Sequence, residues 1–166
     1  NVHGPVQGVF ITNSEALGGE VGFNWNDTDP STDFPELLLI NNFHSNSYIY
    51  GVYTNNINQI SIYGGLFLHF DAGTDTYMSV SLNNGSNATV SGTITNGSNP
   101  TGGSETGISL ANFSVGNVYG NQNEGVEGPV VSVTGTSSYV SVTGNVGAYY
   151  PSYTGDKIVG CGNNVL

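Results

Sequence analysis

The sequence contains the five residues Val-Ser-Val-Thr-Gly twice in close succession, at Val131 to Gly135 and at Val140 to Gly144. Val and Thr favour a pleated strand, and the glycine after each unit tolerates the backbone conformations that tight corners need. The repeat therefore predicts two short adjacent strands with Val inward and Ser or Thr outward. Such repetition is typical of all-β chains that stack equivalent strands and expose long side-chain ladders, which suit the binding of extended polymers.

Short strands are predicted along the whole chain, because stretches such as Met78 to Leu82 alternate apolar with small polar residues. The expected strands are 8–12, 20–24, 37–41, 48–54, 58–63, 66–70, 77–82, 88–95, 108–115, 130–134, 139–143 and 145–149. At most one helical turn is expected at Ser14 to Leu17, since Gly18 and Gly19 follow it. The longest irregular segments are expected at 24–35, 96–106 and 121–129.

Two all-β architectures fit these strands, a parallel β-helix and a β-sandwich or jelly roll. Asn84-Gly85 and Asn96-Gly97 have the chemistry of sandwich hairpins. Solenoid corners with Gly and Asn are more frequent, and they occur at Gly92, Gly116-Asn117, Gly120-Asn121, Gly144-Asn145 and Gly162-Asn163. The parallel β-helix is therefore the favoured fold class.

The composition indicates one domain and excludes several kinds of partner. The chain has 166 residues and a net charge of −11, with 12 carboxylates against a single basic residue, Lys157. Nucleic acid and anionic lipid surfaces are held largely by Lys and Arg, so neither is an expected partner. No apolar run is long enough to cross a bilayer, so no membrane insertion is expected. We expect residues 1–166 to form a single all-β domain that is a fragment of a longer chain, because there is no initiating Met.

The single cysteine and the glycosylation motifs give little information about the function. Cys161 is the one cysteine, which excludes an intrachain disulfide, and its expected role is a buried core thiol. Asn-x-Ser/Thr sequons begin at Asn26, Asn84, Asn87, Asn96 and Asn112. Chance supplies several of these in a chain so rich in Asn, Ser and Thr.

The segment from Phe23 to Glu36 concentrates acidic residues around Trp25, the only tryptophan. Oxygen ligands at alternate positions, Asp27, Asp29, Ser31 and Asp33, match the start of a calcium loop. The match then fails, because Thr32 and Leu38 replace the Gly and the bidentate Glu of an EF-hand. No cofactor is therefore expected, and a looser calcium site at Asp27, Asp29 and Asp33 stays open. The histidines His3, His44 and His69 lack metal-ligand spacing.

Glycosidases need two carboxyl groups that flank the bond they cut. The candidate catalytic residues are Asp27, Asp29, Asp33, Glu36, Asp71 and Asp75. A role as solvated loop residues is the alternative for each of them.

Aromatic residues give the stronger functional argument, because their faces pack on the apolar faces of sugar rings while nearby Asn and Ser supply hydrogen bonds. The candidate carbohydrate-binding residues are Trp25, Tyr48, Tyr50, Tyr53, Tyr63 and His44. Strand alternation predicts that Tyr48 and Tyr50 share one face, with Ile49 on the other. Ordinary packing in the core or at a subunit interface is the competing interpretation.

Three stretches carry a family resemblance: Ile57 to Gly65, Val90 to Asn96 and Val140 to Asn145. With their glycine and asparagine corners they resemble the coils of bacteriophage tailspikes and related pectate-lyase-like proteins. The resemblance implies a right-handed parallel β-helix over residues 37–166. It also implies a homotrimer on the virion tail, outside the cell, that recognises or cuts bacterial surface polysaccharide.

Three functions remain open from the sequence. The first is a carbohydrate-binding attachment domain that uses the aromatic and amide groups. The second is a polysaccharide depolymerase, a glycoside hydrolase that uses a pair of the carboxylates above. The third is a structural segment that drives trimerisation.

Overall fold

The protein is a parallel β-solenoid. The computed structural model describes residues 8–28, 37–69, 76–97, 105–124, 129–137, 139–148 and 158–159. Every pair of strands among these residues is parallel, and none of them lies in a helix. The antiparallel hairpins of a sandwich or jelly roll are therefore not the architecture of this part of the chain, and the favoured β-helix is confirmed as a fold class.

The strands vary in length because several of them continue across a corner of the solenoid. Their bounds are β1 Gly8–Leu17, β2 Val21–Asn26, β3 Leu37–Ser47, β4 Tyr50–Asn55, β5 Gln59–His69, β6 Tyr77–Ser91, β7 Ile94–Asn96, β8 Glu105–Tyr119, β9 Gln122–Glu124, β10 Val131–Thr134, β11 Tyr139–Thr143, β12 Val146–Ala148 and β13 Ile158–Val159.

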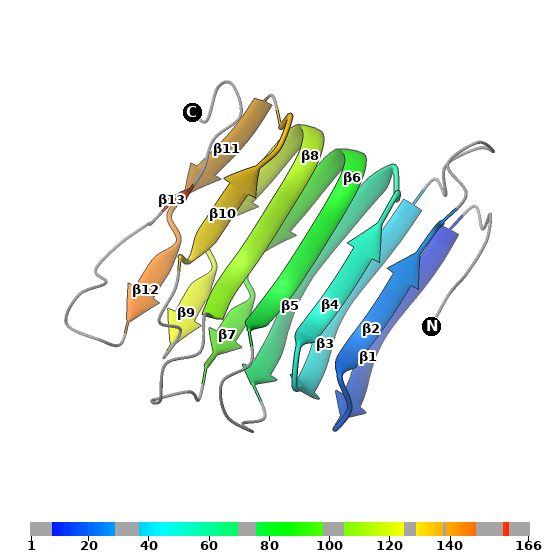
Figure 1. The fold of residues 1–166 in the computed structure, drawn as a ribbon. Coiled ribbons are helices and arrows are strands. Elements are labelled where there is room, and N and C mark those ends of the chain that lie inside the picture. Colours follow the sequence, from blue (N-terminus) through cyan, green and yellow to red (C-terminus); the bar gives the residue numbers. More distant parts are fainter. Residues whose placement is uncertain are drawn as a thin grey trace.

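The registers divide the solenoid into three faces, along which the chain passes in turn before it starts the next coil (Figure 1). Face 1 stacks residues 8–12, 37–41, 59–63, 87–91, 115–119 and 139–143. Face 2 stacks residues 14–17, 43–47, 65–69, 94–96, 122–124 and 146–148. Face 3 stacks residues 21–26, 50–55, 77–83, 105–111, 131–134 and 158–159.

Two of the corners are made by single residues in the left-handed backbone region, which Gly and Asn enter at low cost. Between faces 1 and 2 these residues are Asn13, Asn42, Gly64, Gly92, Gly120 and Gly144, with φ from 47° to 65°. Between faces 3 and 1 they are Asn56, Asn84, Asn112 and Gly135, with φ from 54° to 69°. The predicted corners at Gly92, Gly120 and Gly144 are thus confirmed. Asn84 belongs to a solenoid corner and not to a hairpin.

The core lies between the three faces. It consists of the side chains that point inward from each strand, where inward and outward positions alternate. In the repeated unit, Val131, Val133, Val140 and Val142 are all buried, as predicted. The two units are not paired with each other, however. Val131–Thr134 lies on face 3 and pairs with residues 108–111, whereas Tyr139–Thr143 lies on face 1 and pairs with residues 115–119.

Three local predictions were wrong. Ser14 to Leu17 is part of strand β1, because it pairs in register with Phe43 to Asn46 of β3. Gly116 is no corner residue; it lies within β8, where a side chain would meet Leu110 Cδ2 at 2.9 Å. The expected irregular segment 121–129 contains the short strand β9, which is paired on both sides.

Candidate binding surface on face 3

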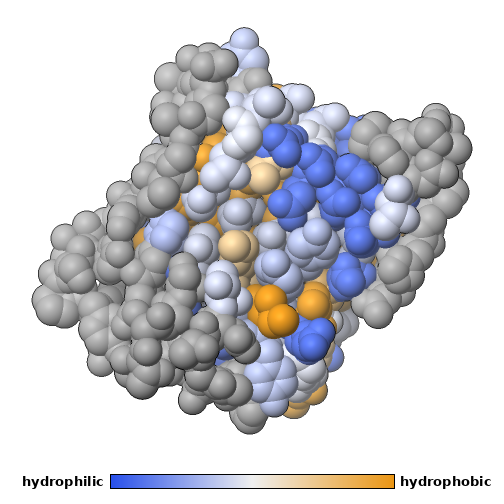
Figure 2. All heavy atoms as spheres, viewed as in Figure 1, coloured by the Kyte–Doolittle hydropathy of each residue, from blue (hydrophilic) through white to orange (hydrophobic). Residues whose placement is uncertain are grey.

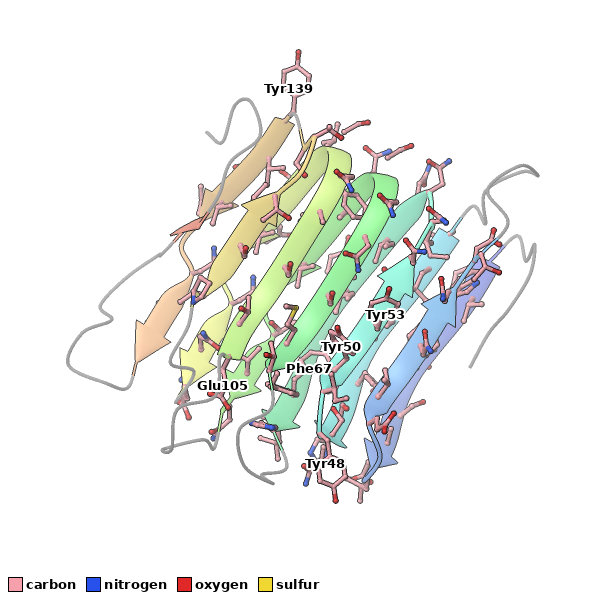
Figure 3. The ribbon with its side chains drawn as sticks, viewed as in Figure 1. Tyr48, Tyr50, Tyr53, Phe67, Glu105 and Tyr139 are labelled. Atoms are coloured by element: carbon pink, nitrogen blue, oxygen red, sulfur yellow. The ribbon has the colours of Figure 1, made fainter. Side chains whose placement is uncertain are left out.

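A pair of tyrosine rings lies on the outer side of face 3. Tyr50 and Tyr53 of β4 have ring centroids 5.0 Å apart at an interplanar angle of 49°, and both side chains are half-buried. Val52 and Thr54, beside them in the same strand, are fully buried and point into the core. Figure 3 shows the two rings standing on the front of β4. They form a small aromatic platform with one side against the sheet and one side in solvent.

A column of asparagine amides continues this surface toward the corner between faces 3 and 1. Asn26, Asn55 and Asn83 occupy the same register position on β2, β4 and β6. The Asn55 side-chain nitrogen donates to Asn26 Oδ1 at 3.0 Å, and that of Asn83 donates to the Thr54 carbonyl at 3.1 Å. Figure 2 shows strongly hydrophilic residues gathered over this end of β2 and β4.

A hollow of about 310 Å³ lies at this corner, beside the end of the column. The residues that line it are Asn56, Asn58, Asn84, Gly85, Ser86 and Asn112. The hollow is therefore bordered by amide and hydroxyl groups and by backbone, with no ionisable side chain in its lining. Its volume is at the lower end of the range typical of small-ligand sites.

The outer side of face 3 carries no charge among the residues that the structure describes. The outward positions of β4, β6 and β8 are taken by Tyr, Asn, Ser, Met, Thr and Ala, and Glu105 points inward with 0% exposure. Neutral hydrogen-bonding groups and an aromatic platform therefore dominate this surface. A surface of this kind can pack on sugar rings and exchange hydrogen bonds with their hydroxyl groups.

Trp25 does not belong to this surface. Its side chain is 0% exposed within the hydrophobic core, and its indole nitrogen makes no hydrogen bond. The expectation that Trp25 contacts a sugar is therefore corrected. Trp25 occupies an inward position of β2, because it pairs with the buried Thr54 of β4.

The other predicted sugar-binding residues lie apart from one another. Tyr48 stands in the bend between faces 2 and 3, just before β4, so strand alternation does not relate it to Tyr50. Tyr63 is 39% exposed on the outer side of face 1. His44 lies on face 2, where its Nδ1 is 3.1 Å from Glu15 Oε1. Only Tyr50 and Tyr53 are brought together.

The candidate catalytic residues are mostly beyond the described ranges. Asp29, Asp33, Glu36, Asp71 and Asp75 lie outside the described residues, as does Cys161. Asp27 is 4% exposed at the corner after β2, where its backbone nitrogen donates to the Asn55 carbonyl at 3.1 Å. Asp27 belongs to no group of three or more His, Cys, Asp or Glu residues within the described part that could hold a metal ion.

Sequence reasoning missed the amide residues of the corner. Asn56, Asn84 and Asn112 recur at intervals of 28 residues (84 − 56 and 112 − 84). This interval is the length of one coil at that point of the solenoid, since Gln59 pairs with Asn87 and Asn87 with Val115. The interval of 28 residues was visible in the sequence. It indicates that the three asparagines are stacked only when the length of one coil is known.

Comparison with family models, with curated proteins and with solved structures found no match. The protein is therefore classified by its fold alone, as a parallel β-solenoid. Within the described residues, no helix has the length and apolar character to span a membrane.

Proposed function

We propose that this protein is a carbohydrate-binding attachment domain, and that the outer side of face 3 binds a neutral polysaccharide of a bacterial surface. The observation that carries the proposal is the contact between Tyr50 and Tyr53, 5.0 Å between ring centroids, on an uncharged surface continuous with the amide column. Aromatic rings supply a platform for the C–H faces of sugars, and amides supply both donors and acceptors for hydroxyl groups.

The dimensions of the surface suit an extended chain. Tyr50 and Asn56 are six residues apart, which corresponds to roughly 20 Å along a strand. A ligand that lies along β4 therefore contacts the tyrosine pair, the amide column and the corner hollow in that order. Several consecutive sugar units are needed to cover that length, so the expected ligand is a polymer and not a single sugar.

The composition supports a neutral ligand. The chain has one basic residue and a net charge of −11, so an acidic polysaccharide would meet repulsion without a compensating cation. The binding of a neutral polysaccharide is not weakened by the negative charge of the protein. Its binding should accordingly be insensitive to ionic strength, in contrast to ligands that are held by charge.

The setting proposed for this activity is a homotrimeric tailspike-like protein on a virion tail, outside the cell. Exposed apolar side chains support subunit packing. Among the described residues they are Leu17, Ile94 and Val146 on face 2 and Phe10, Tyr63, Val115, Tyr119 and Tyr139 on face 1. Exposed apolar groups on one side of a soluble protein favour contact with another protein surface. Analytical ultracentrifugation tests the trimer, and a monomer across the micromolar range would contradict this part of the proposal.

Calorimetric titration with a panel of neutral bacterial polysaccharides tests the binding function. Tyr53→Ala removes half of the aromatic platform without touching the core, and we expect it to weaken binding about tenfold, or about 1.4 kcal/mol. Tyr139→Ala is the matched control, since Tyr139 is 63% exposed on face 1 and should leave binding unchanged. Failure of the whole panel to bind, or equal affinity of Tyr53→Ala and the parent protein, would contradict the proposal.

The same incubations separate binding from cleavage. Release of new reducing ends would assign a hydrolase activity in addition to binding, and single Asp→Asn or Glu→Gln variants of the six candidate carboxylates would then locate the catalytic pair. Binding without new reducing ends is the outcome expected for an attachment domain.

A further inference from the structure

The corner between faces 3 and 1 uses asparagine where the backbone does not require it. Asn56, Asn84 and Asn112 have φ of 58°, 54° and 62°, and Gly135 continues the same column with φ of 69°. At the corner between faces 1 and 2, four of the six left-handed residues are glycine at similar φ. Glycine satisfies this conformation at least as well as asparagine. The three amides therefore contribute something beyond the turn.

Two of these amides, Asn112 and Asn84, form a chain with Asn55, whereas Asn56 Nδ2 donates to the Asp27 carbonyl at 2.7 Å. Asn112 Nδ2 donates to Asn84 Oδ1 at 2.8 Å, and Asn84 Nδ2 donates to Asn55 Oδ1 at 2.7 Å. Each of these bonds uses one of the two N–H groups of a carboxamide and one of the two lone pairs of its oxygen. The Asn112 oxygen is fully used, because it accepts from the backbone nitrogen and the hydroxyl group of Thr136 at 2.9 and 3.3 Å. Asn84 keeps one N–H group and one lone pair beside the hollow.

Asn58 adds another side-chain amide to the hollow, and this amide makes fewer hydrogen bonds than the others. Its side chain lines the hollow and is half-buried, and it makes no hydrogen bond with any other described residue. Its backbone carbonyl is occupied, since it accepts from the backbone nitrogens of Ser86 and Asn87 at 3.0 and 2.9 Å. The Asn58 side chain is thus positioned by a fixed backbone but keeps its donors and acceptor for a ligand.

We infer that this hollow, the amide hollow, binds the acetamido group of an N-acetylated sugar within the polysaccharide. An acetamido group has one N–H donor and one carbonyl acceptor in the same plane, so it can add to the asparagine chain as one further amide. This inference rests on the proposed function and specifies the class of glycan that the surface selects.

Other sugar substituents fit the amide hollow less well. A protonated amino group only donates, and so it leaves the amide N–H groups without an acceptor. A carboxylate only accepts, and it finds no cationic side chain in the lining. A hydroxyl group can donate and accept, but it does so through a single oxygen, whereas the acetamido group offers a separate donor and a separate acceptor.

Three β-1,4-linked tetrasaccharides that differ at one substituent test the inference. These are the tetramers of N-acetylglucosamine, of glucosamine and of glucose, titrated calorimetrically against the full chain. We expect the N-acetylated tetramer to bind at least tenfold more tightly than the other two. We expect Asn84→Gly and Asn58→Ala to abolish this preference, so that each variant binds the three tetramers with equal affinity.

Asn42→Gly is the matched control. Asn42 has φ of 53° and donates to Asn13 Oδ1 at 2.9 Å, so it is an equivalent amide at the other corner. Its variant should keep the preference. Thermal unfolding of each variant checks the fold, and Asn58→Ala interrupts none of the side-chain bonds described above.

The outcomes distinguish this inference from the proposed function. Equal affinity for the three tetramers would overturn the acetamido site and leave polysaccharide binding intact. Loss of the preference in Asn42→Gly would overturn it too, because the effect would then act through the fold. Binding of none of the three would also overturn it, and the wider polysaccharide panel alone would then decide the proposed function.

Discussion

His69 and Glu105 form a hydrogen-bonded pair inside the solenoid, with Nδ1 2.6 Å from Oε1 and side chains that are 2% and 0% exposed. His69 ends β5 on face 2 and Glu105 begins β8 on face 3, so the pair joins two faces across the core. The ring of Tyr77 stacks on His69 at 4.5 Å with an angle of 9°. A polar centre thus replaces apolar packing at this end of the coils.

Removal of one member of this pair should destabilise the protein strongly. Glu105→Leu leaves His69 buried without its carboxylate, and a loss of about 3–5 kcal/mol is expected in the free energy of unfolding, measured in urea at pH 7. Glu105→Gln should cost less, because its amide oxygen still accepts from Nδ1–H. The exposed pair of Glu15 and His44 is the control, and Glu15→Gln should cost less than about 1 kcal/mol. Equal losses at the two sites would refute this account.

Alkaline pH should destabilise the fold through Tyr77. Burial, with a further contribution from the charge of Glu105, raises the pKa of Tyr77 well above its ordinary value of 10.0. Above pH 10 the unfolded chain ionises this phenol while the folded chain retains the proton, so stability falls as pH rises, by about 1.4 kcal/mol per pH unit. Tyr77→Phe should remove this component of the slope between pH 10 and 11.

The exposed Tyr139 provides the comparison for that experiment, since Tyr139→Phe should leave the alkaline slope as it is. Denaturation at a series of pH values gives the slopes directly. A Tyr77→Phe slope identical to that of the parent protein would show that the buried phenol is not responsible.

Asn121 should be among the most sensitive polar residues of the core. It is 2% exposed, accepts from the Thr93 backbone nitrogen at 3.0 Å, and donates to the Val90 carbonyl at 3.1 Å. Asn121→Leu removes the side-chain partner of both backbone groups, which costs about 1–3 kcal/mol of unfolding free energy for each group left unsatisfied. Asn117→Ala, at an exposed position on face 1, should change it by less than about 0.5 kcal/mol. Similar midpoints for both variants in guanidinium would count against the role given to Asn121.

Gly51 should not tolerate a side chain. A Cβ atom there would lie 2.5 Å from the Ser79 carbonyl oxygen and 2.7 Å from Phe67 Cδ1. Because one of these contacts is backbone, Gly51→Ala must displace a neighbouring coil, at an expected cost of about 1–3 kcal/mol. Ser109→Ala, on the outer side of the same face, should be nearly neutral. Thermal melts compare the two, and an unchanged melting temperature for Gly51→Ala would contradict the close packing of faces 2 and 3.

Two local features explain why the aromatic pair was predicted incorrectly, since Tyr48 lies in the bend before β4 and the strand is irregular at Gly51. Regular alternation places Tyr48 with Tyr50, but the pairing of β4 with β6 passes from Tyr50 directly to Val52. This irregularity at Gly51 brings Tyr50 and Tyr53, three residues apart, to the same side of the sheet. Alternation is a property of a regular strand, so it fails at Gly51, where one backbone pair is missing although the offset between β4 and β6 is 28 residues on both sides (78 − 50 and 80 − 52).

The class of fold, the corners at Gly92, Gly120 and Gly144 and the inward valines of the repeated unit could all be predicted from the amino-acid sequence. These features depend on local preferences, namely the period of two in strands and the access of glycine to positive φ. Three other features are visible only in the folded protein: Trp25 is buried, the two repeated units lie on different faces, and His69 contacts Glu105, 36 residues away in the chain. Those relationships depend on the lengths of the coils, which set the register between residues far apart in the chain and which no single segment encodes.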